Sequence, residues 1–270
     1  MSGSTLAGVR AHNRRRLIVI VLGTGVLGCF GALALQRPAH DLEPAWQESQ
    51  VGKRIDRDCE YLGRNPEGYF EFRHRKTGIV FVWIPGVADR NAPRFGSRGS
   101  AATGDLLIAK HEVSQRQWED VMGPLADAAV DDRFPVGDVT WDECREFCRQ
   151  SGLDLPYESE WERCCSDAAT DEGHLPLHRV DVGPRNGFGL LNMAGNASEW
   201  CEFAARQGVP SNGGFASRQP RLDPLCKPYR GGSLNGPWPC GLRMCGERTG
   251  RTTKLGFRPV LRLSEGVANE

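Results

Sequence analysis

One apolar segment near the start of the chain most constrains its architecture. Residues 17–35 read LIVIVLGTGVLGCFGALAL, nineteen residues without a charge, which is just long enough for a helix to cross a hydrocarbon core of about 30 Å. The basic cluster at residues 14–16 precedes this segment, and only Arg37 follows it closely. The positive-inside rule therefore places residues 1–16 in the cytoplasm as a basic tail, and residues 38–270 on the periplasmic or extracellular side.

A cleaved signal peptide is the alternative interpretation of the same segment. Ala32 and Ala34 form an Ala-x-Ala cleavage site. The apolar run is longer than the roughly 7 to 15 residues of a signal-peptide core, which favours a membrane anchor. Both interpretations export the remainder of the chain, so the predicted compartment does not depend on the choice.

The composition predicts a single exported domain that is rich in turns. Gly (33) and Pro (17) together make 50 of the 270 residues, which is typical of many turns and few long regular elements. Lys plus Arg and Asp plus Glu both number 34, and this zero net charge disfavours nucleic acid as a partner. Ten cysteines are many for a cytosolic protein of this size but are compatible with disulfides in an exported one.

The exported part divides into a polar segment and a folded domain. Residues 38–76 are polar and show no sustained period, so we interpret them as a stalk with a short extra element. An apolar run begins after Gly78, and we place the domain at residues 78–263, with a tail at 264–270. The predicted strands lie at residues 79–84, 105–109, 229–233 and 256–261.

Two helices begin with capping boxes, in which an N-cap hydroxyl and a carboxylate or amide three residues later satisfy each other's backbone N–H groups. Ser114 with Gln117 predicts the first helix, and Thr140 with Glu143 predicts the second. A third helix is predicted after Tyr157, which is a weaker N-cap residue.

Six motifs occur in one order along the exported domain. They are EVSQRQW (112–118), PVGDVTWDECREFC (135–148), LPYESEWERCC (155–165), NGFGLLNMAGNASEW (186–200), YRGGS (229–233) and LGFR (255–258). Together they resemble the formylglycine-generating enzyme family, also called sulfatase-modifying factors, over residues 78–263. The resemblance implies a compact α+β domain with little regular secondary structure, related in outline to C-type lectins.

The resemblance is incomplete where the family's oxidases hold copper. Those enzymes convert a sulfatase cysteine to formylglycine, with copper bound by two cysteines that follow a Gly-Gly-Ser motif by three and eight residues. Ser233 is retained, but Gly236 stands at the first cysteine position, and Cys240 is one residue short of the second. Ser198 replaces a Trp that lines the oxygen pocket. Ser233 and Cys240 are thus the catalytic candidates, while the departures disfavour copper and imply loss of the oxidase activity.

The cysteines leave an enzymatic alternative open. One alternative is a divergent formylglycine-generating oxidase that uses Cys240 together with another thiol, such as Cys245 or Cys201. The other is an oxidoreductase that acts on a different, unidentified substrate. The resemblance itself matches Cys165 and Cys245 to a disulfide-linked pair, and the pairing of the other cysteines stays open.

A calcium site is the family feature that the sequence retains in full. The family binds Ca²⁺ through side chains at Asn192 and Glu199 and through main-chain carbonyls at Gly195 and Ala197, and such hard oxygens are the ligands Ca²⁺ prefers. The alternative is that Glu199 caps a turn and Asn192 bonds to backbone. The combined prediction is a calcium-stabilised binding or accessory module, whose partner is a protein, peptide or glycan outside the cytoplasm.

Overall fold

The computed structural model describes residues 55–86, 105–125, 131–165, 176–203, 226–232 and 240–262. All of them belong to a compact unit that spans Pro38–Glu270. The predicted anchor at residues 17–35 and the predicted tail at 264–270 lie outside the described residues, as does Ser233. Within the described ranges, no helix has the length and apolar character needed to span a bilayer.

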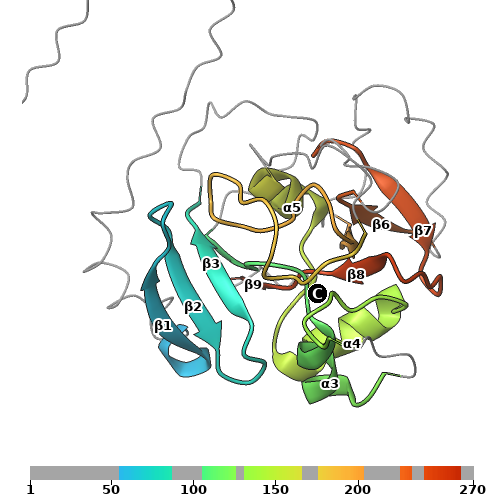
Figure 1. Ribbon diagram of the computed structural model, residues 1–270, viewed down its shortest axis with the longest axis horizontal. Helices are drawn as coiled ribbons and strands as arrows, with labels where there is room; N and C mark the ends of the chain where they lie inside the picture. Colours follow the sequence, from blue (N-terminus) through green and yellow to red (C-terminus); the bar gives the residue numbers. More distant parts are fainter. Residues whose placement is uncertain are drawn as a thin grey trace, which may run out of the picture. The chain divides into compact units, whose positions relative to one another are not determined.

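The first sheet has five antiparallel strands, seen with β1 to β3 at the left of Figure 1. Its strands, in spatial order, are β1 (Cys59–Arg64), β2 (Phe70–His74), β3 (Val80–Ile84), β4 (Leu106–Ala109) and β9 (Val260–Arg262). The predicted strands at 79–84 and 105–109 are confirmed as β3 and β4. Every residue of β4 is buried, as expected for a strand in the middle of a packed sheet.

The hairpin β1–β2 corrects the predicted domain boundary. Both strands lie in residues 38–76, which we interpreted as a stalk with a short extra element, and they extend the first sheet outward from β3. Phe70, Phe72 and His74 of β2 are buried at alternate positions, which is the period of a half-buried strand. This alternating pattern covers only the five residues of β2 and is surrounded by charged residues. For that reason the sequence pattern did not distinguish the strand from a polar linker.

The second sheet has four strands in the order β7-β6-β5-β8. They are β5 (Ser198–Trp200), β6 (Cys226–Arg230), β7 (Met244–Glu247) and β8 (Leu255–Phe257), with β5 parallel to β8. The predicted strand at 256–261 is therefore two strands, because β8 lies in the second sheet and β9 in the first. The chain crosses between the sheets at Arg258 and Pro259, and this crossing places the Arg258 side chain in the interior.

The three predicted helices are confirmed as α3 (Gln115–Met122), α4 (Trp141–Ser151) and α5 (Glu158–Cys165). Both capping boxes are formed at α3 and α4. At the start of α5, the Glu160 carboxylate accepts a hydrogen bond from the Tyr157 backbone N–H at 2.7 Å. The helix starts are thus determined by local hydrogen bonds that the sequence makes recognisable.

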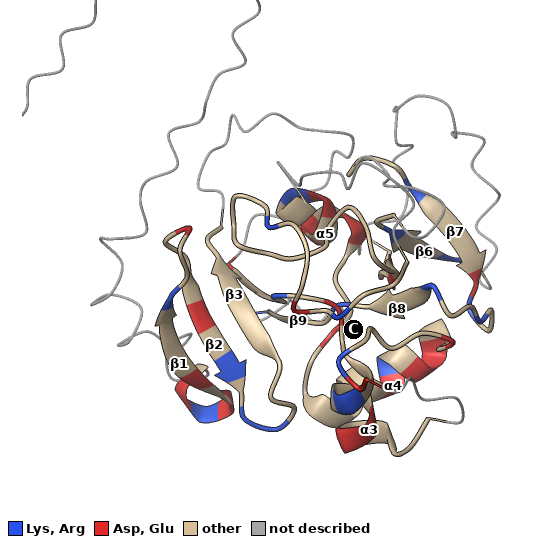
Figure 2. Ribbon diagram, viewed as in Figure 1, with Lys and Arg blue, Asp and Glu red and all other residues tan. Residues whose placement is uncertain are grey.

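The interior contains two clusters of buried side chains. One lies beneath α3 and α4, where the rings of Trp118, Phe147 and Phe257 pack together. The other surrounds α5 and contains Trp161 and Val260. Figure 2 shows that basic and acidic residues are interleaved along β1, β2 and α4, and many of them form ion pairs with one another.

Candidate functional site

Two disulfides lie at the end of α5 and across β6 and β7. Cys165, the last residue of α5, is bonded to Cys240, and Cys226 is bonded to Cys245, with Cα atoms 5.6 and 5.9 Å apart. Both separations lie in the usual disulfide range. The pairing of Cys165 with Cys245 is therefore wrong, although both residues are half-cystines. Antiparallel pairing sets Cys245 opposite Pro228 of β6, so the strands themselves bring Cys245 close to Cys226.

The cysteines considered for a copper site are either disulfide-bonded or buried in this arrangement. The Cys240 sulfur is used in its bond to Cys165, and Cys245 is equally occupied. Cys201 is fully buried, and this burial raises the pKa of its thiol well above the ordinary value. Within the described part of the chain, no group of three or more His, Cys, Asp or Glu side chains is placed to hold a metal ion.

The segment 192–199 forms a buried loop that leads into β5. Asn192 and Asn196 have φ values of 59° and 60°, a left-handed conformation that Asn tolerates better than most residues. Strand β5 then holds Glu199 between two neighbours, opposite Arg230 of β6 and beside Gly256 of β8. The Glu199 side chain is consequently in the interior, with a relative exposure of 0%.

Both oxygens of the Glu199 carboxylate have protein partners. Arg258 Nε lies 3.1 Å from each oxygen, and a terminal nitrogen of Arg258 lies 2.8 Å from Oε1. The indole N–H of Trp161 donates to Oε2 at 2.6 Å. The ion pair is almost completely removed from solvent, with side-chain exposures of 0% for Arg258 and 1% for Glu199.

A second buried carboxylate, Glu112, lies against the same loop. Asn192 Nδ2 donates to one of its oxygens at 3.3 Å, and Asn196 Nδ2 donates to the other at 3.0 Å. Burial, aided by the nearby negative charge of Glu199 and opposed by Arg258, raises the pKa of Glu112 from 4.5 to about 7. Asn192 and Asn196 therefore donate hydrogen bonds to Glu112, a carboxylate that the sequence analysis did not identify as a site residue.

These contacts test whether the loop fits Ca²⁺. Calcium requires about six to eight oxygen ligands, but the Glu199 oxygens are occupied by Arg258 and Trp161. Asn192 Oδ1 is a buried acceptor that has no hydrogen-bond partner among the described residues. Gly195 and Ala197 are buried in the same loop. Calcium binding by these four residues therefore stays a prediction, in which the Glu199 carboxylate already has two protein partners and Asn192 Oδ1 has none among the described residues.

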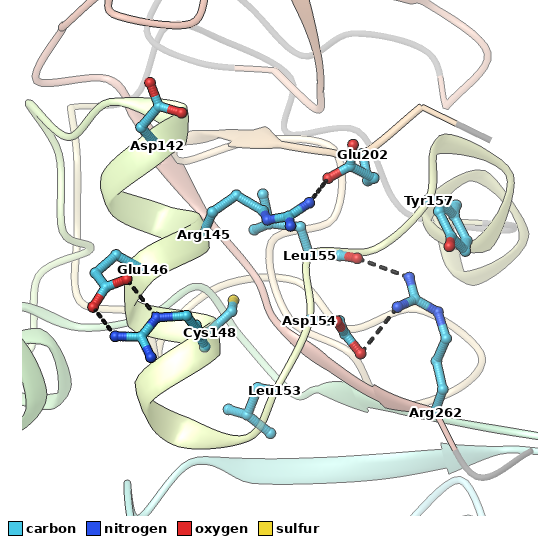
Figure 3. A pocket seen from close by; sticks show the side chains of 11 residues that line it. Asp142, Arg145, Glu146, Cys148, Leu153, Asp154, Leu155, Tyr157, Glu202 and Arg262 are labelled. Atoms are coloured by element: carbon cyan, nitrogen blue, oxygen red, sulfur yellow. Dashed lines mark hydrogen bonds and ion pairs between the residues drawn. The ribbon is translucent and has the colours of Figure 1, made fainter. Parts of the chain in front are cut away.

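A separate pocket of about 310 Å³ lies between α4 and the end of β9 (Figure 3). Arg145 of α4 bonds to Glu202 at 2.6 Å, and Arg262 of β9 bonds to Asp154 at 3.1 Å. The Cys148 thiol also lines this pocket, but burial raises its pKa far above the ordinary value, so it remains protonated.

Apart from Asp142, which pairs with Arg248 outside the pocket, the charged side chains of this pocket pair with each other as drawn in Figure 3. Besides the two pairs above, Arg149 bonds to Glu146 at 2.6 Å along α4, and the Arg262 guanidinium lies over the Tyr157 ring at 4.1 Å. Exposed ion pairs such as that of Arg149 with Glu146 contribute only about 0 to 1 kcal/mol each. The lining of the pocket is thus polar, with most of its charges neutralised within the protein.

Sequence reasoning missed two central residues of the buried network, Glu112 and Arg258. Both stand inside quoted motifs, at the start of EVSQRQW and at the end of LGFR. The sequence signal that could have identified them was a charged residue beside apolar residues that are expected to be buried. A charge in such a position needs a partner of opposite charge.

Comparison with known proteins agrees with this fold. The family described as sulfatase-modifying factor enzyme 1-like domain matches residues 68–179. The formylglycine-generating enzyme of Bos taurus is 27% identical over 119 residues, which cover 33% of this chain and 32% of that protein. The inactive C-alpha-formylglycine-generating enzyme 2 of Bos taurus is 24% identical over 159 residues, covering 48% of this chain and 52% of that protein. The chain thus matches between a third and about half of these relatives' length.

A solved structure adds evidence for the fold alone. PvdO from Pseudomonas aeruginosa superposes with a TM-score of 0.50 at 17% identity, covering 75% of this chain and 98% of that one. The family match begins at residue 68, inside the segment that we interpreted as a stalk with a short extra element, in agreement with the position of β2. Over residues 68–179 the chain is therefore similar to the sulfatase-modifying factor, or formylglycine-generating enzyme, family.

Proposed function

We propose that this chain is an exported, membrane-anchored member of its family that lacks copper oxidase activity and acts as a binding or accessory module. The observation that carries the proposal is the disulfide between Cys165 and Cys240. Cu(I) is held by soft thiolates, and a sulfur committed to a disulfide does not offer one. Cys240 is the single cysteine near a family copper position, because Gly236 stands at the other.

Two further features support the loss of oxidase activity. Ser198, at the position where the resemblance implies a Trp of the oxygen pocket, is a small buried residue at the start of β5. One relative is named an inactive enzyme, so a non-catalytic member of this family has precedent. We carry that property to this chain only as part of the proposal.

The disulfides also support export. Disulfides persist in oxidising compartments and are rare in the cytosol. Two of them in one domain are consistent with the topology expected from residues 14–16 and the apolar segment 17–35. In this proposal the domain faces the periplasm or the exterior and meets its protein, peptide or glycan ligand there, with the pocket beside α4 as one candidate place of binding.

The proposal is tested by an oxidase assay on the full-length protein in detergent. The protein is incubated with Cu(I), oxygen and a peptide that contains the sulfatase-type sequence Cys-x-Pro-x-Arg, and mass spectrometry follows conversion of the thiol to an aldehyde. We expect no conversion, while an active family member in the same mixture converts the peptide. Conversion by this protein would overturn the proposal in favour of a divergent oxidase.

A further inference from the structure

The disulfide between Cys226 and Cys245 lies at the edge of the second sheet. Strand β7 is the end strand in the order β7-β6-β5-β8, so β6 is its only partner strand among the described residues. The register places Cys226 opposite Glu247 and Cys245 opposite Pro228, which makes the two cysteines diagonal neighbours across the strand pair. Their bond therefore ties the edge strand covalently to the rest of the sheet.

The two disulfides of the domain differ in their exposure to solvent. Cys245 is exposed and Cys226 is half-buried. In the other disulfide, Cys165 has a relative exposure of 0%, and Cys240 is packed against the buried cluster around α5. Thiol–disulfide exchange requires a thiolate to reach one of the two sulfurs, so the disulfide across β6 and β7 is the more reactive of the two.

The direction of attack also favours Cys245. A thiolate approaches one sulfur from the side opposite the other sulfur, which then leaves. For Cys245 this side faces away from β6, and the described residues place no further strand beyond β7. An incoming thiolate can therefore reach Cys245 from the open edge of the sheet, with Cys226 as the leaving group.

The same strand covers a buried tryptophan. Gly246 follows Cys245 and, because side chains alternate along a strand, faces the opposite side of the sheet. A Cβ atom at Gly246 would lie 3.2 Å from the Trp200 ring and 3.3 Å from the Tyr229 ring, so β7 packs closely on both rings. Trp200 has a relative exposure of 0%, and β7 is part of what shields it from water.

We propose that the Cys226–Cys245 disulfide is a redox site, at which this domain reacts with a dithiol protein of the Cys-x-x-Cys class, and that its reduction loosens β7 over Trp200. The first thiolate of the dithiol bonds to Cys245 Sγ, the bond to Cys226 breaks, and Cys226 leaves as a thiolate that takes up a proton. The second thiolate then attacks its partner sulfur in the mixed disulfide and releases Cys245, which is also protonated. The domain gains two electrons and two protons, and the dithiol becomes a disulfide.

The test measures the reduction rate of each disulfide in the full-length native protein. The protein is treated with dithiothreitol or with reduced thioredoxin, samples are quenched with acid and alkylated, and mass spectrometry follows each cysteine. We expect Cys226 and Cys245 to become alkylated at least about tenfold faster than Cys165 and Cys240, and the two rates to converge in concentrated urea, where the fold no longer controls access. Equal rates in the native protein, earlier opening of the Cys165–Cys240 bond, or free Cys226 and Cys245 thiols before any reductant is added would overturn the proposal.

Acrylamide quenching of tryptophan fluorescence tests the effect on β7. Selective reduction should increase quenching, because Trp200 loses part of its cover. The double variant Cys226→Ser with Cys245→Ser is the control, and it should show the increased quenching without reductant and no further change when reductant is added. Quenching that stays the same after selective reduction of the parent would overturn the assigned effect on β7, as would a response to reductant that persists in the double variant.

Discussion

Removing the charge of Arg258 tests the energetics of the buried network most severely. The substitution Arg258→Met keeps an unbranched side chain but leaves Glu199 buried without a counter-ion. Removal of one partner of a buried ion pair typically lowers the free energy of unfolding by about 3–5 kcal/mol. The carbonyls of Ala109 and Leu191 also lose their donors, and this adds to the cost. For a domain with about 5–15 kcal/mol of total stability, we expect a large fall in the free energy of unfolding.

The assay is urea unfolding at equilibrium, with an exposed ion pair as the matched control. Arg149 bonds to Glu146 at 2.6 Å, but the side chains are 73% and 39% exposed, so Arg149→Met should cost at most about 1 kcal/mol. The double variant Glu199→Gln with Arg258→Met should lose less than the sum of its single variants, because neither charge is then left alone. If Arg258→Met and Arg149→Met lowered the free energy of unfolding equally, the buried ion pair would not have the stabilising role described here. The same would follow if the effects of Glu199→Gln and Arg258→Met were additive in the double variant.

Three further predictions concern the disulfide, the second buried carboxylate and a helix cap. Cys240→Ser opens a disulfide that spans 75 residues of sequence and should lower the free energy of unfolding by about 2–4 kcal/mol, measured by urea unfolding under non-reducing conditions. Burial raises the pKa of Glu112 to about 7, so its contribution to stability is fully present below pH 4.5 and is lost as the pH rises towards 7. Glu112→Gln should therefore gain stability relative to the parent over that range, on the order of 2–3 kcal/mol, and a difference that does not vary with pH would contradict this. In the parent protein, the free energy of unfolding should vary less with pH than Glu112 alone would make it. Burial lowers the pKa of His111 to about 4, so the stability that neutral His111 contributes is lost as the pH falls below 6.5, which is the opposite direction to the loss from Glu112. Thr140→Ala removes the hydroxyl that accepts from the Glu143 backbone N–H and should cost about 1 kcal/mol, seen as a lower Tm with the fold retained.

The parts of the fold that local chemistry determines could be predicted from the sequence. Ser114 and Thr140 mark the starts of α3 and α4, because a capping box needs only four consecutive residues. The strand β2 was not predicted, because its alternating pattern is short and its burial depends on pairing with β3. The motif LGFR was assigned to one strand, since nothing local shows that the chain changes sheets at Arg258.

The candidate site was harder to predict, because its contacts join residues far apart in the chain. Glu199 and Arg258 are separated by 59 positions, so their pairing depends on how β5 and β8 lie together. The partner of Cys165 could not be chosen by spacing, because Cys240 and Cys245 are only five residues apart. The choice follows from the β6–β7 register, which brings Cys245 close to Cys226.

The sulfur of Cys240 is bonded to Cys165 and is thereby withheld from copper, and peptide mapping of the disulfides examines that bond itself. Free thiols of the full-length protein are alkylated before digestion, and the peptides are analysed by mass spectrometry without reduction. We predict a linked pair of peptides that joins Cys165 to Cys240. Recovery of Cys240 as an alkylated free thiol would contradict the account and would favour the divergent oxidase.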